Sequence, residues 1–417
     1  MVKASRNENR VYKFDIGRVN DIFKRGNSME KEKIIKTTQE LIRIRTENPP
    51  GNEEACADYV EQFFKNAGIK TLRMKVEEKR PNIIAKLKGN FNKPLVFLAH
   101  MDTVEVGEDW NVGPFSGEIR EGKLYGRGAA DMKGGLAVGM NVIAEISKMN
   151  LQLKRDLLFF AYVDEEEPSA KGIDALIKEG MIPENAFILI LEPTNLKLAI
   201  AAKGVGWYEV IVKGKSAHAA TPWEGANSIM AMSLMLVKLK DRVDRLKYDH
   251  PLLGRPQFTV GKIIGGLKGK VNMVPSSCKA EIDLRFVPPL SCDDVTEMID
   301  ICIKEACKTI PGTSGSMRNL SFPKPPFFSE ADSILVKSIE MSYQEVTGKH
   351  LEKFGMLGYT DASVVGAKQN NKNCYVFGPG NIAQGHAVDE FVPIDEIYDC
   401  YQILLSAAVD LLTRGDD

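Results

Sequence analysis

The sequence Leu95-Val96-Phe97-Leu98-Ala99-His100-Met101-Asp102 has the composition of a buried strand with polar residues at its end. Its continuous apolar run is typical of a strand covered on both faces, as in the parallel sheet of an α/β domain. Side chains two positions apart on a strand point the same way, so we expect His100 and Asp102 to lie together where the strand leaves the sheet. Open α/β sheets bind ligands at that edge, and an imidazole beside a carboxylate is typical of a metal ligand and the group that orients it.

Two further apolar runs also end in acidic residues. Residues 157–163 are followed by Asp164-Glu165-Glu166-Glu167, and residues 187–191 are followed by Glu192. A glycine-rich turn places Asp131 at the predicted start of a helix near the same edge. Four acidic residues in a row are ordinarily a solvated loop. Carboxylates gathered at one edge, however, repel one another unless cations neutralise them, so the pattern predicts one or two divalent metal ions.

Length and composition limit the classes of protein to consider. The 417 residues exceed what one hydrophobic core usually holds, so about two domains are expected. A net charge of -1 gives no electrostatic basis for binding nucleic acid or an anionic membrane, and no apolar run approaches the roughly 20 residues of a membrane span. The seven cysteines contain no C-x-x-C pair, which favours reduced thiols and a cytoplasmic location over a disulfide framework or a zinc knuckle.

The N-terminal segment and a central segment both differ from the α/β pattern. Residues 1–28 are polar and mildly basic, without the apolar core of a signal peptide, and we expect a poorly ordered extension. After Gly206 the predicted elements follow in the order strand, helix, two strands and helix: 207–212, 227–239, 258–264, 278–286 and 295–307. This order predicts a small α+β insert at residues 205–317, with an antiparallel sheet whose edge strand would pair with a second subunit. The catalytic domain would comprise residues 29–204 and 318–417.

From Met29 onward, a series of short motifs covers most of the chain: Asn48-Pro49-Pro50-Gly51, His100-Met101-Asp102-Thr103-Val104, Gly126-Arg127-Gly128, Asp131-Met132-Lys133-Gly134-Gly135, Asp164-Glu165-Glu166, Glu192-Pro193-Thr194, Ser216-Ala217-His218, Asn272-Met273-Val274-Pro275, Asp283-Leu284-Arg285 and Gly385-His386. Each motif is weak alone, but together and in this order they resemble the dinuclear zinc hydrolases that include acetylornithine deacetylase, succinyl-diaminopimelate desuccinylase, aminoacylase and carboxypeptidase G. The resemblance implies a mostly parallel central sheet flanked by helices, with an inserted ferredoxin-like domain that forms a homodimer.

Carried over position by position, the resemblance implies two divalent metal ions, of which Asp131 would bridge both. His100 and Glu192 would complete one metal site, and Glu166 and His386 the other. Imidazole and carboxylate ligands suit zinc, and also permit cobalt or manganese.

The resemblance also assigns roles to residues that bind no metal. Glu165 resembles the general base, and Asp102 resembles the partner that orients the His100 ring. The additional Glu167 permits an alignment shifted by one residue, which would exchange the base and ligand roles because neighbouring side chains on an extended chain face opposite ways. We align Asp164 with the first residue of the family's Asp-Glu-Glu motif, which sets the register of Glu165 and Glu166.

Four positions outside the metal ligands resemble groups that touch the substrate. His218 resembles a histidine that reaches across the dimer in these enzymes to stabilise the oxyanion of the reaction, although alone it would be interpreted as a surface histidine. Asn272 and Arg285 resemble substrate contacts. The fork of Arg285 suits a carboxylate, and a salt bridge on the sheet face is an equally good interpretation. Thr360 would line the substrate pocket.

These observations predict a cytoplasmic, metal-dependent amidohydrolase that removes an N-acyl group from a small amino acid, of the acetylornithine deacetylase or succinyl-diaminopimelate desuccinylase type. A metal-activated water would attack the amide, and Glu165 would take its proton. A dipeptidase or carboxypeptidase with the same dinuclear site is the first alternative, and Glu192 in place of Asp slightly favours the deacylases. A non-catalytic metal-binding scaffold is the second, but such a protein would have little use for Glu165. Nucleotide binding is set aside, since Gly126-Arg127-Gly128 lacks the third glycine of the dinucleotide fingerprint.

Overall fold

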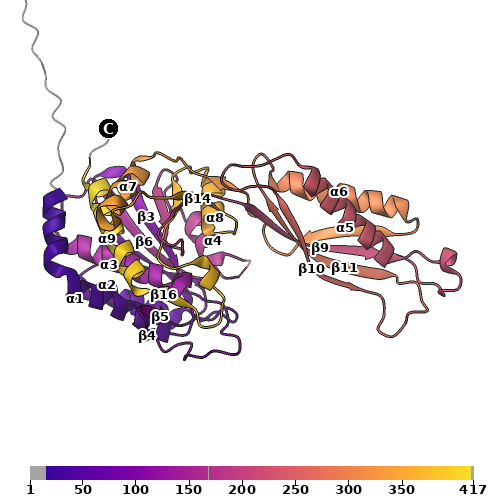
Figure 1. Ribbon diagram of the computed structural model, residues 1–417, viewed down its shortest axis with the longest axis horizontal. Coiled ribbons are helices and arrows are strands. Elements are labelled where there is room, and N and C mark those ends of the chain that lie inside the picture. The colour runs from indigo at the N-terminus through magenta and orange to yellow at the C-terminus, as the bar shows by residue number, and fades with distance from the viewer. Residues whose placement is uncertain (1–15, 168, 415–417) are drawn as a thin grey trace, which may run out of the picture.

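The computed structural model describes residues 16–167 and 169–414, and it shows two sheets that lie at opposite ends of an elongated molecule (Figure 1). The larger, central sheet has nine strands: β1 (Thr71–Glu77), β2 (Arg80–Leu87), β3 (Phe91–His100), β6 (Arg155–Tyr162), β7 (Phe187–Ile190), β8 (Leu198–Ala202), β13 (Phe327–Phe328), β14 (Lys353–Met356) and β15 (Cys374–Val376). Their order is β1-β2-β6-β3-β7-β15-β8-β13, and β14 pairs with β8.

The middle of the central sheet is parallel, as predicted. Strand β3 pairs in parallel with β6 and with β7, and β15 pairs in parallel with β7. The carboxyl ends of these strands therefore meet at one edge of the sheet, which brings the acidic segments that follow them close together. The outer pairs, β1 with β2 and β8 with β13, are antiparallel.

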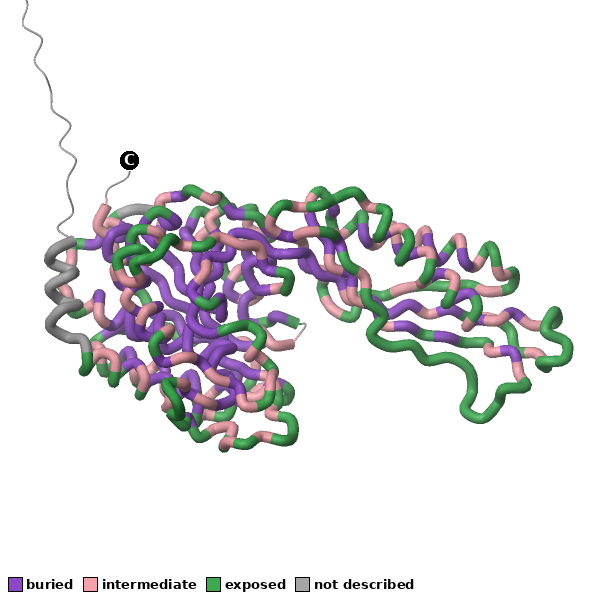
Figure 2. The backbone as a smooth tube through the Cα atoms, in the orientation of Figure 1, coloured by how far each residue is buried: buried purple, intermediate pink, exposed green. Residues whose placement is uncertain are grey.

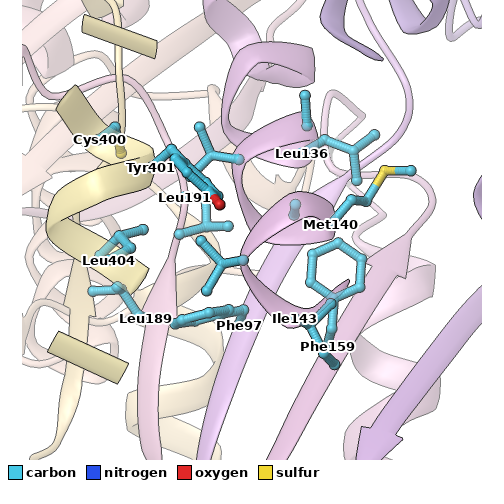
Figure 3. Close-up of a cluster of buried hydrophobic side chains, with 14 of the residues drawn as sticks. Phe97, Leu136, Met140, Ile143, Phe159, Leu189, Leu191, Cys400, Tyr401 and Leu404 are labelled. Carbon is cyan, nitrogen blue, oxygen red and sulfur yellow. The ribbon is translucent and has the colours of Figure 1, made fainter. Parts of the chain in front are cut away.

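Helices cover both faces of the central sheet. One face packs against α1 (Ile16–Arg43), α2 (Glu54–Asn66), α3 (Gly134–Lys148), α7 (Ile334–Thr347) and α9 (Ile394–Thr413), and the other packs against α4 (Lys171–Lys178) and α8 (Asp361–Gln369). Strand β3 alternates between the faces, with Phe97 in the first core and Leu98 in the second. Figure 3 shows Phe97 among Phe159, Leu189 and Leu404 in the first core. Burying a side chain of this size stabilises the folded state by about 1.5–3 kcal/mol. Because both faces of β3 are covered, successive residues are all buried, and the apolar run is therefore continuous.

The smaller sheet is antiparallel and lies at the far end of the molecule (Figure 1). It consists of β9 (Gly204–Lys213), β10 (Gln257–Gly265), β11 (Ser277–Phe286) and β12 (Ser314–Asn319) in the order β10-β11-β9-β12, and α5 (Ser228–Arg245) and α6 (Cys292–Thr309) pack on one face. The edge strand β10 is mostly exposed (Figure 2). A third, small sheet has the order β16-β5-β4 and consists of β4 (Glu118–Arg120), β5 (Lys123–Tyr125) and β16 (Phe391–Pro393).

Two boundaries differ from the prediction. The expected poorly ordered extension covers residues 1–28, but α1 already begins at Ile16, and only residues 1–15 lie outside the described residues. Extending a helix that already packs on the core costs much less than starting a new one, which explains why polar residues continue it. Strand β12 runs to Asn319, two residues beyond the predicted end of the insert at 317. Its Ser, Gly and Asn residues are mostly exposed and give no apolar signal.

Two general properties of the chain bear on its class. Within residues 16–167 and 169–414, we find no helix that is both long enough and apolar enough to cross a bilayer. All seven cysteines are free thiols, and five of them are buried in helices or strands of the cores. The role of the smaller sheet in dimerisation stays a prediction.

Candidate active site

Two groups of possible metal ligands meet at the carboxyl edge of the central sheet. In the first, His100 Nε2 lies 3.1 Å from Asp131 Oδ1 and 3.5 Å from Glu192 Oε1. In the second, His386 Nε2 lies 2.9 Å from Glu166 Oε2 and 3.7 Å from Asp131 Oδ2. Within each group the ligand atoms lie within 4.8 Å of one another. Asp131 belongs to both groups and presents one oxygen to each, so the structure brings together all five residues predicted as ligands.

Each of these residues owes its position to the end of an element. His100 is the last residue of β3, Glu192 follows β7 by two residues, and Glu166 lies in the loop after β6. His386 follows the short helix η3 (Ile382–Gln384), and Asp131 lies in η1 (Ala129–Lys133), a π-helical turn that leads into α3. The parallel arrangement of the strands therefore places side chains from distant parts of the sequence at one point.

The chemistry of this cluster fits a pair of divalent cations. Burial and the charge of Asp131 raise the pKa of Glu166 well above its usual range, and the same two causes raise the pKa of Glu192 to about 7. Glu166 Oε1 is buried and has no hydrogen-bond partner among the described residues. Carboxylates in a buried, mutually repulsive arrangement need positive charge, and the mixture of imidazole and carboxylate suits zinc, cobalt or manganese.

The turn that carries Asp131 is held by Glu390. The Glu390 carboxylate accepts hydrogen bonds from the backbone N–H groups of Gly128 (2.9 Å), Ala130 (2.9 Å) and Asp131 (3.0 Å). It also accepts one from Nη1 of Arg127 at 2.7 Å. Both Arg127 and Glu390 are buried. Because a charged, fully bonded carboxylate fixes this backbone, the position of Asp131 is set before any ligand binds.

Close packing of α3 explains Gly135, the second of the two glycines that follow the turn. A Cβ atom at Gly135 would lie 2.0 Å from the carbonyl oxygen of Leu191, which is backbone and cannot move aside. Leu191 directly precedes the predicted ligand Glu192. The absence of a side chain at Gly135 therefore lets the helix approach the end of β7 closely, so that Asp131 and Glu192 belong to one site.

Asp102 acts on the site differently from the prediction. His100 Nδ1 lies 2.9 Å from the carbonyl oxygen of Asp102, and 3.6 Å from its carboxylate oxygen Oδ1. The Asp102 carboxylate instead accepts hydrogen bonds from the backbone N–H groups of Glu165 (3.2 Å) and Glu166 (3.1 Å), and from Asn48 Nδ2 (2.9 Å). The main chain of Asp102 thus orients the imidazole, and its side chain holds the acidic loop.

The contacts of the acidic loop agree with the register placed on Asp164, and the roles of these residues stay a prediction. Asp164 belongs to neither ligand group and pairs with Arg80 at 2.8 Å, while Glu166 contacts His386. Glu165 lines the cavity beside the ligands without belonging to either group. Burial and the nearby charge of Asp361 raise the pKa of Glu165 well above its usual range. This environment suits a group that takes and gives a proton.

The site opens into a cavity of about 350 Å³, a size that suits a small molecule. Arg285 and Thr360, both predicted as substrate contacts, line it. Several other lining residues were not predicted from the sequence, among them Trp207, Lys324, Tyr359 and Ile382. Of these, only Tyr359 had a signal, because it precedes Thr360 in a segment that was expected to reach the pocket.

His218 and Asn272 do not reach this cavity within one chain. Both are exposed on the smaller sheet's connecting loops, where the N–H of Ala219 donates to the carbonyl oxygen of Asn272 at 2.9 Å. His218 Nδ1 accepts from the N–H of Ala220 at 3.0 Å. The two residues therefore lie together, but neither lines the cavity beside the predicted metal ligands of the same chain.

Taken together, the parallel sheet and the paired imidazole and carboxylate groups at its edge define a metal-dependent hydrolase. The chain belongs to Peptidase family M20/M25/M40, whose model matches residues 96–410. It is a hydrolase that acts on amide bonds, and the family depends on metal ions.

Individual relatives agree with this assignment. The chain is 29% identical to a probable succinyl-diaminopimelate desuccinylase of Staphylococcus aureus, over 92% of this chain and 98% of the relative. It is 28% identical to acetylornithine deacetylase of Buchnera aphidicola, over 86% of this chain and 92% of the relative. Among solved structures, a tripeptidase from Staphylococcus aureus has a TM-score of 0.75 at 20% identity, and the match covers 92% of this chain and 99% of the tripeptidase. A dinuclear metal-binding M20 peptidase from Bacillus subtilis has a TM-score of 0.70 at 14% identity, and the match covers 92% of this chain and 98% of that peptidase. The two structures show that the fold is shared.

Proposed function

We propose that this protein is a dinuclear metal amidohydrolase that removes an N-acyl group from a small amino acid, of the desuccinylase or acetylornithine deacetylase type. The observation that carries the proposal is the position of Asp131, whose two carboxylate oxygens face two separate ligand groups. The names of the two relatives similar in sequence favour deacylation over peptide hydrolysis.

The residues of the chain divide the work of hydrolysis between them. When bound, two divalent cations supply charge that lowers the pKa of a water to about 7 and polarises an amide carbonyl. The Glu165 carboxylate, which is held by the backbone contact with Asp102, would accept a proton from the attacking water. Glu165 would then deliver this proton to the nitrogen of the leaving amine as the amide C–N bond breaks. The products are a carboxylate and a free amine.

The proposed active enzyme is a homodimer. His218 is the expected partner of the oxyanion, yet it does not line the cavity of its own chain. A second copy, paired through the exposed edge of the smaller sheet, would bring its own His218 to this cavity. An arrangement of this kind would leave the active site incomplete in a monomer.

Amine release from a panel of compounds tests the proposed function. The panel contains N-acetyl amino acids, N-succinyl-diaminopimelate and dipeptides, each incubated with zinc-loaded and with chelator-treated protein. We expect metal-dependent release from one acylated amino acid to exceed release from every dipeptide. Faster release from dipeptides would assign the protein to the peptidases, and no release from any compound would favour the non-catalytic scaffold.

A further inference from the structure

Lys324 is a buried cation in the wall of the cavity, and neither the sequence motifs nor the comparisons assign it a role. Its residue is 2% exposed. The backbone on both sides is fixed, because the N–H of Lys324 donates to the carbonyl oxygen of Val205 at 2.9 Å and the N–H of Val205 donates back at 2.8 Å. This pairing directs the side chain toward the cavity that also contains Glu165 and Glu192.

The ammonium group of Lys324 has no acceptor for its protons. Nζ lies 3.7 Å from the centre of the Tyr359 ring and 5.3 Å from the centre of the Trp207 ring. Within residues 16–167 and 169–414, no carboxylate or carbonyl oxygen forms a hydrogen bond or ion pair with it. Aromatic faces attract a cation, but they leave its three N–H donors unused. The charges of Asp361 and Glu165 act on this ammonium group, but neither carboxylate forms a hydrogen bond with it. A substrate anion would therefore supply the acceptors that its N–H donors lack.

Arg285, the other cation of the cavity wall, is already paired. Its Nε donates to Asp283 Oδ1 and its Nη2 donates to Asp283 Oδ2, both at 2.8 Å. Trp207 Nε1 donates to the same carboxylate at 3.0 Å. The Nε and Nη2 edge of the guanidinium is therefore occupied by the protein itself, and its charge is already balanced by Asp283, which makes Arg285 the weaker candidate for the main anchor.

We propose that Lys324, rather than Arg285, binds a carboxylate of the substrate in the cavity. This inference rests on the proposed function, because it assumes that the cavity receives an acylated amino acid. Such a molecule offers two sources of the same chemistry: the α-carboxylate of the amino acid, and a distal carboxylate when the acyl group is a dicarboxylic acid. Either one would supply the acceptors that the ammonium group lacks.

The test compares N-succinyl-alanine with its two monoamides, in which either the succinyl or the α-carboxylate becomes a neutral amide. Hydrolysis and calorimetric binding are measured with zinc-loaded protein and with the variants Lys324→Met and Lys324→Gln. We expect both variants to weaken binding of the parent compound and raise its KM about 10- to 100-fold, as a lost charged hydrogen bond would. One of the two monoamides lacks the carboxylate that Lys324 contacts, and wild-type protein and the variants should bind that monoamide with equal affinity. Its identity shows whether Lys324 binds the α-carboxylate or the succinyl carboxylate.

Lys203→Met is the matched control. Lys203 is also buried, but its Nζ already donates to the carbonyl oxygen of Arg255 (2.7 Å) and to Gln257 Oε1 (3.2 Å). Its loss should affect the parent and both monoamides to the same degree. The proposal is overturned if the Lys324 variants weaken all three compounds equally, if they weaken none, or if wild-type protein binds none. If the protein binds these compounds but hydrolyses none, the proposed function fails, while calorimetry still decides the role of Lys324.

Discussion

Neighbouring carboxylates of the acidic loop have different partners. Asp164 pairs with Arg80, Glu165 faces the cavity, and Glu166 contacts His386. Burial raises the pKa of Asp164, but hydrogen bonds from Ser169 and the Lys171 N–H outweigh it and lower that pKa, whereas burial raises the pKa of Glu165. The loop thus combines a structural anion, the proposed general base and a predicted metal ligand within three residues.

The variant Glu165→Gln tests the role of the middle residue. Glutamine keeps the size of the side chain but accepts no proton, so we expect kcat to fall about 10²- to 10⁴-fold while bound zinc stays unchanged. The measurement is kcat together with zinc content. Glu167→Gln is the control, because Glu167 lies outside both ligand groups, and it should alter kcat far less. Normal turnover by Glu165→Gln would show that the register is shifted.

The strand-end residues could be predicted from sequence because they depend on local rules. His100, Glu166 and Glu192 follow continuous apolar runs, and parallel strands end at one edge. Lys324 could not be predicted in this way. It lies in a proline-rich segment without periodicity, and only the backbone pairing with Val205, which joins residues far apart in the chain, directs it to the cavity.

At the scale of elements, the turn η1 depends on a carboxylate that is distant in sequence. Glu390 satisfies three backbone N–H groups of residues 128–131 and the guanidinium of Arg127. A buried charge left partly unbonded is costly, so the turn and the segment that carries Glu390 stabilise each other. The position of Asp131, with one carboxylate oxygen toward each ligand group, is therefore a property of the turn as well as of the residue.

The variant Glu390→Gln should weaken metal binding about 10- to 100-fold, because groups that orient a ligand typically contribute this much to affinity. An amide cannot accept all the hydrogen bonds of the carboxylate, so the turn loses its fixed geometry. Zinc affinity is measured by competition with a chromogenic chelator. Asp389→Asn is the matched control, since Asp389 is half-buried and accepts hydrogen bonds from Asn111 instead. Equal zinc affinities of the two variants would contradict a role for Glu390.

Elements differed in how well the sequence predicted them. The buried strands β3, β6 and β7 have long apolar runs, and all three were expected. Strands β12 and β14 were missed, because β12 is polar and exposed, and β14 has only four residues. Such strands form because a neighbouring strand offers its backbone hydrogen bonds, which is a tertiary effect that composition does not show.

At the scale of the whole molecule, the two sheets separate the predicted chemistry. The predicted metal ligands lie at the edge of the central sheet, whereas His218 lies in a loop of the part of the chain that forms the smaller sheet. The sequence motifs placed both in one active site, and a single chain does not join them. In a homodimer, His218 of each copy could reach the active site of the other copy, and the two parts of the predicted chemistry would then meet.

Mixing two inactive variants tests this exchange. Glu165→Gln and His218→Ala should each be inactive alone. In an equal mixture that exchanges subunits, half of the dimers are mixed, and each has one complete site, so activity should return to roughly a quarter of the wild-type value. The assay is amide hydrolysis before and after co-refolding. A mixture that stays as inactive as its components would show that His218 does not act across a dimer.

The most direct test of the dinuclear site is a zinc titration of chelator-stripped protein, with bound zinc and amide hydrolysis followed together. The structure offers two ligand groups joined by Asp131. We therefore expect no hydrolysis without metal, uptake of two zinc ions per chain, and turnover that rises as these sites fill. Unchanged hydrolysis by protein from which all metal has been removed would contradict a metal-dependent active site at this edge of the sheet.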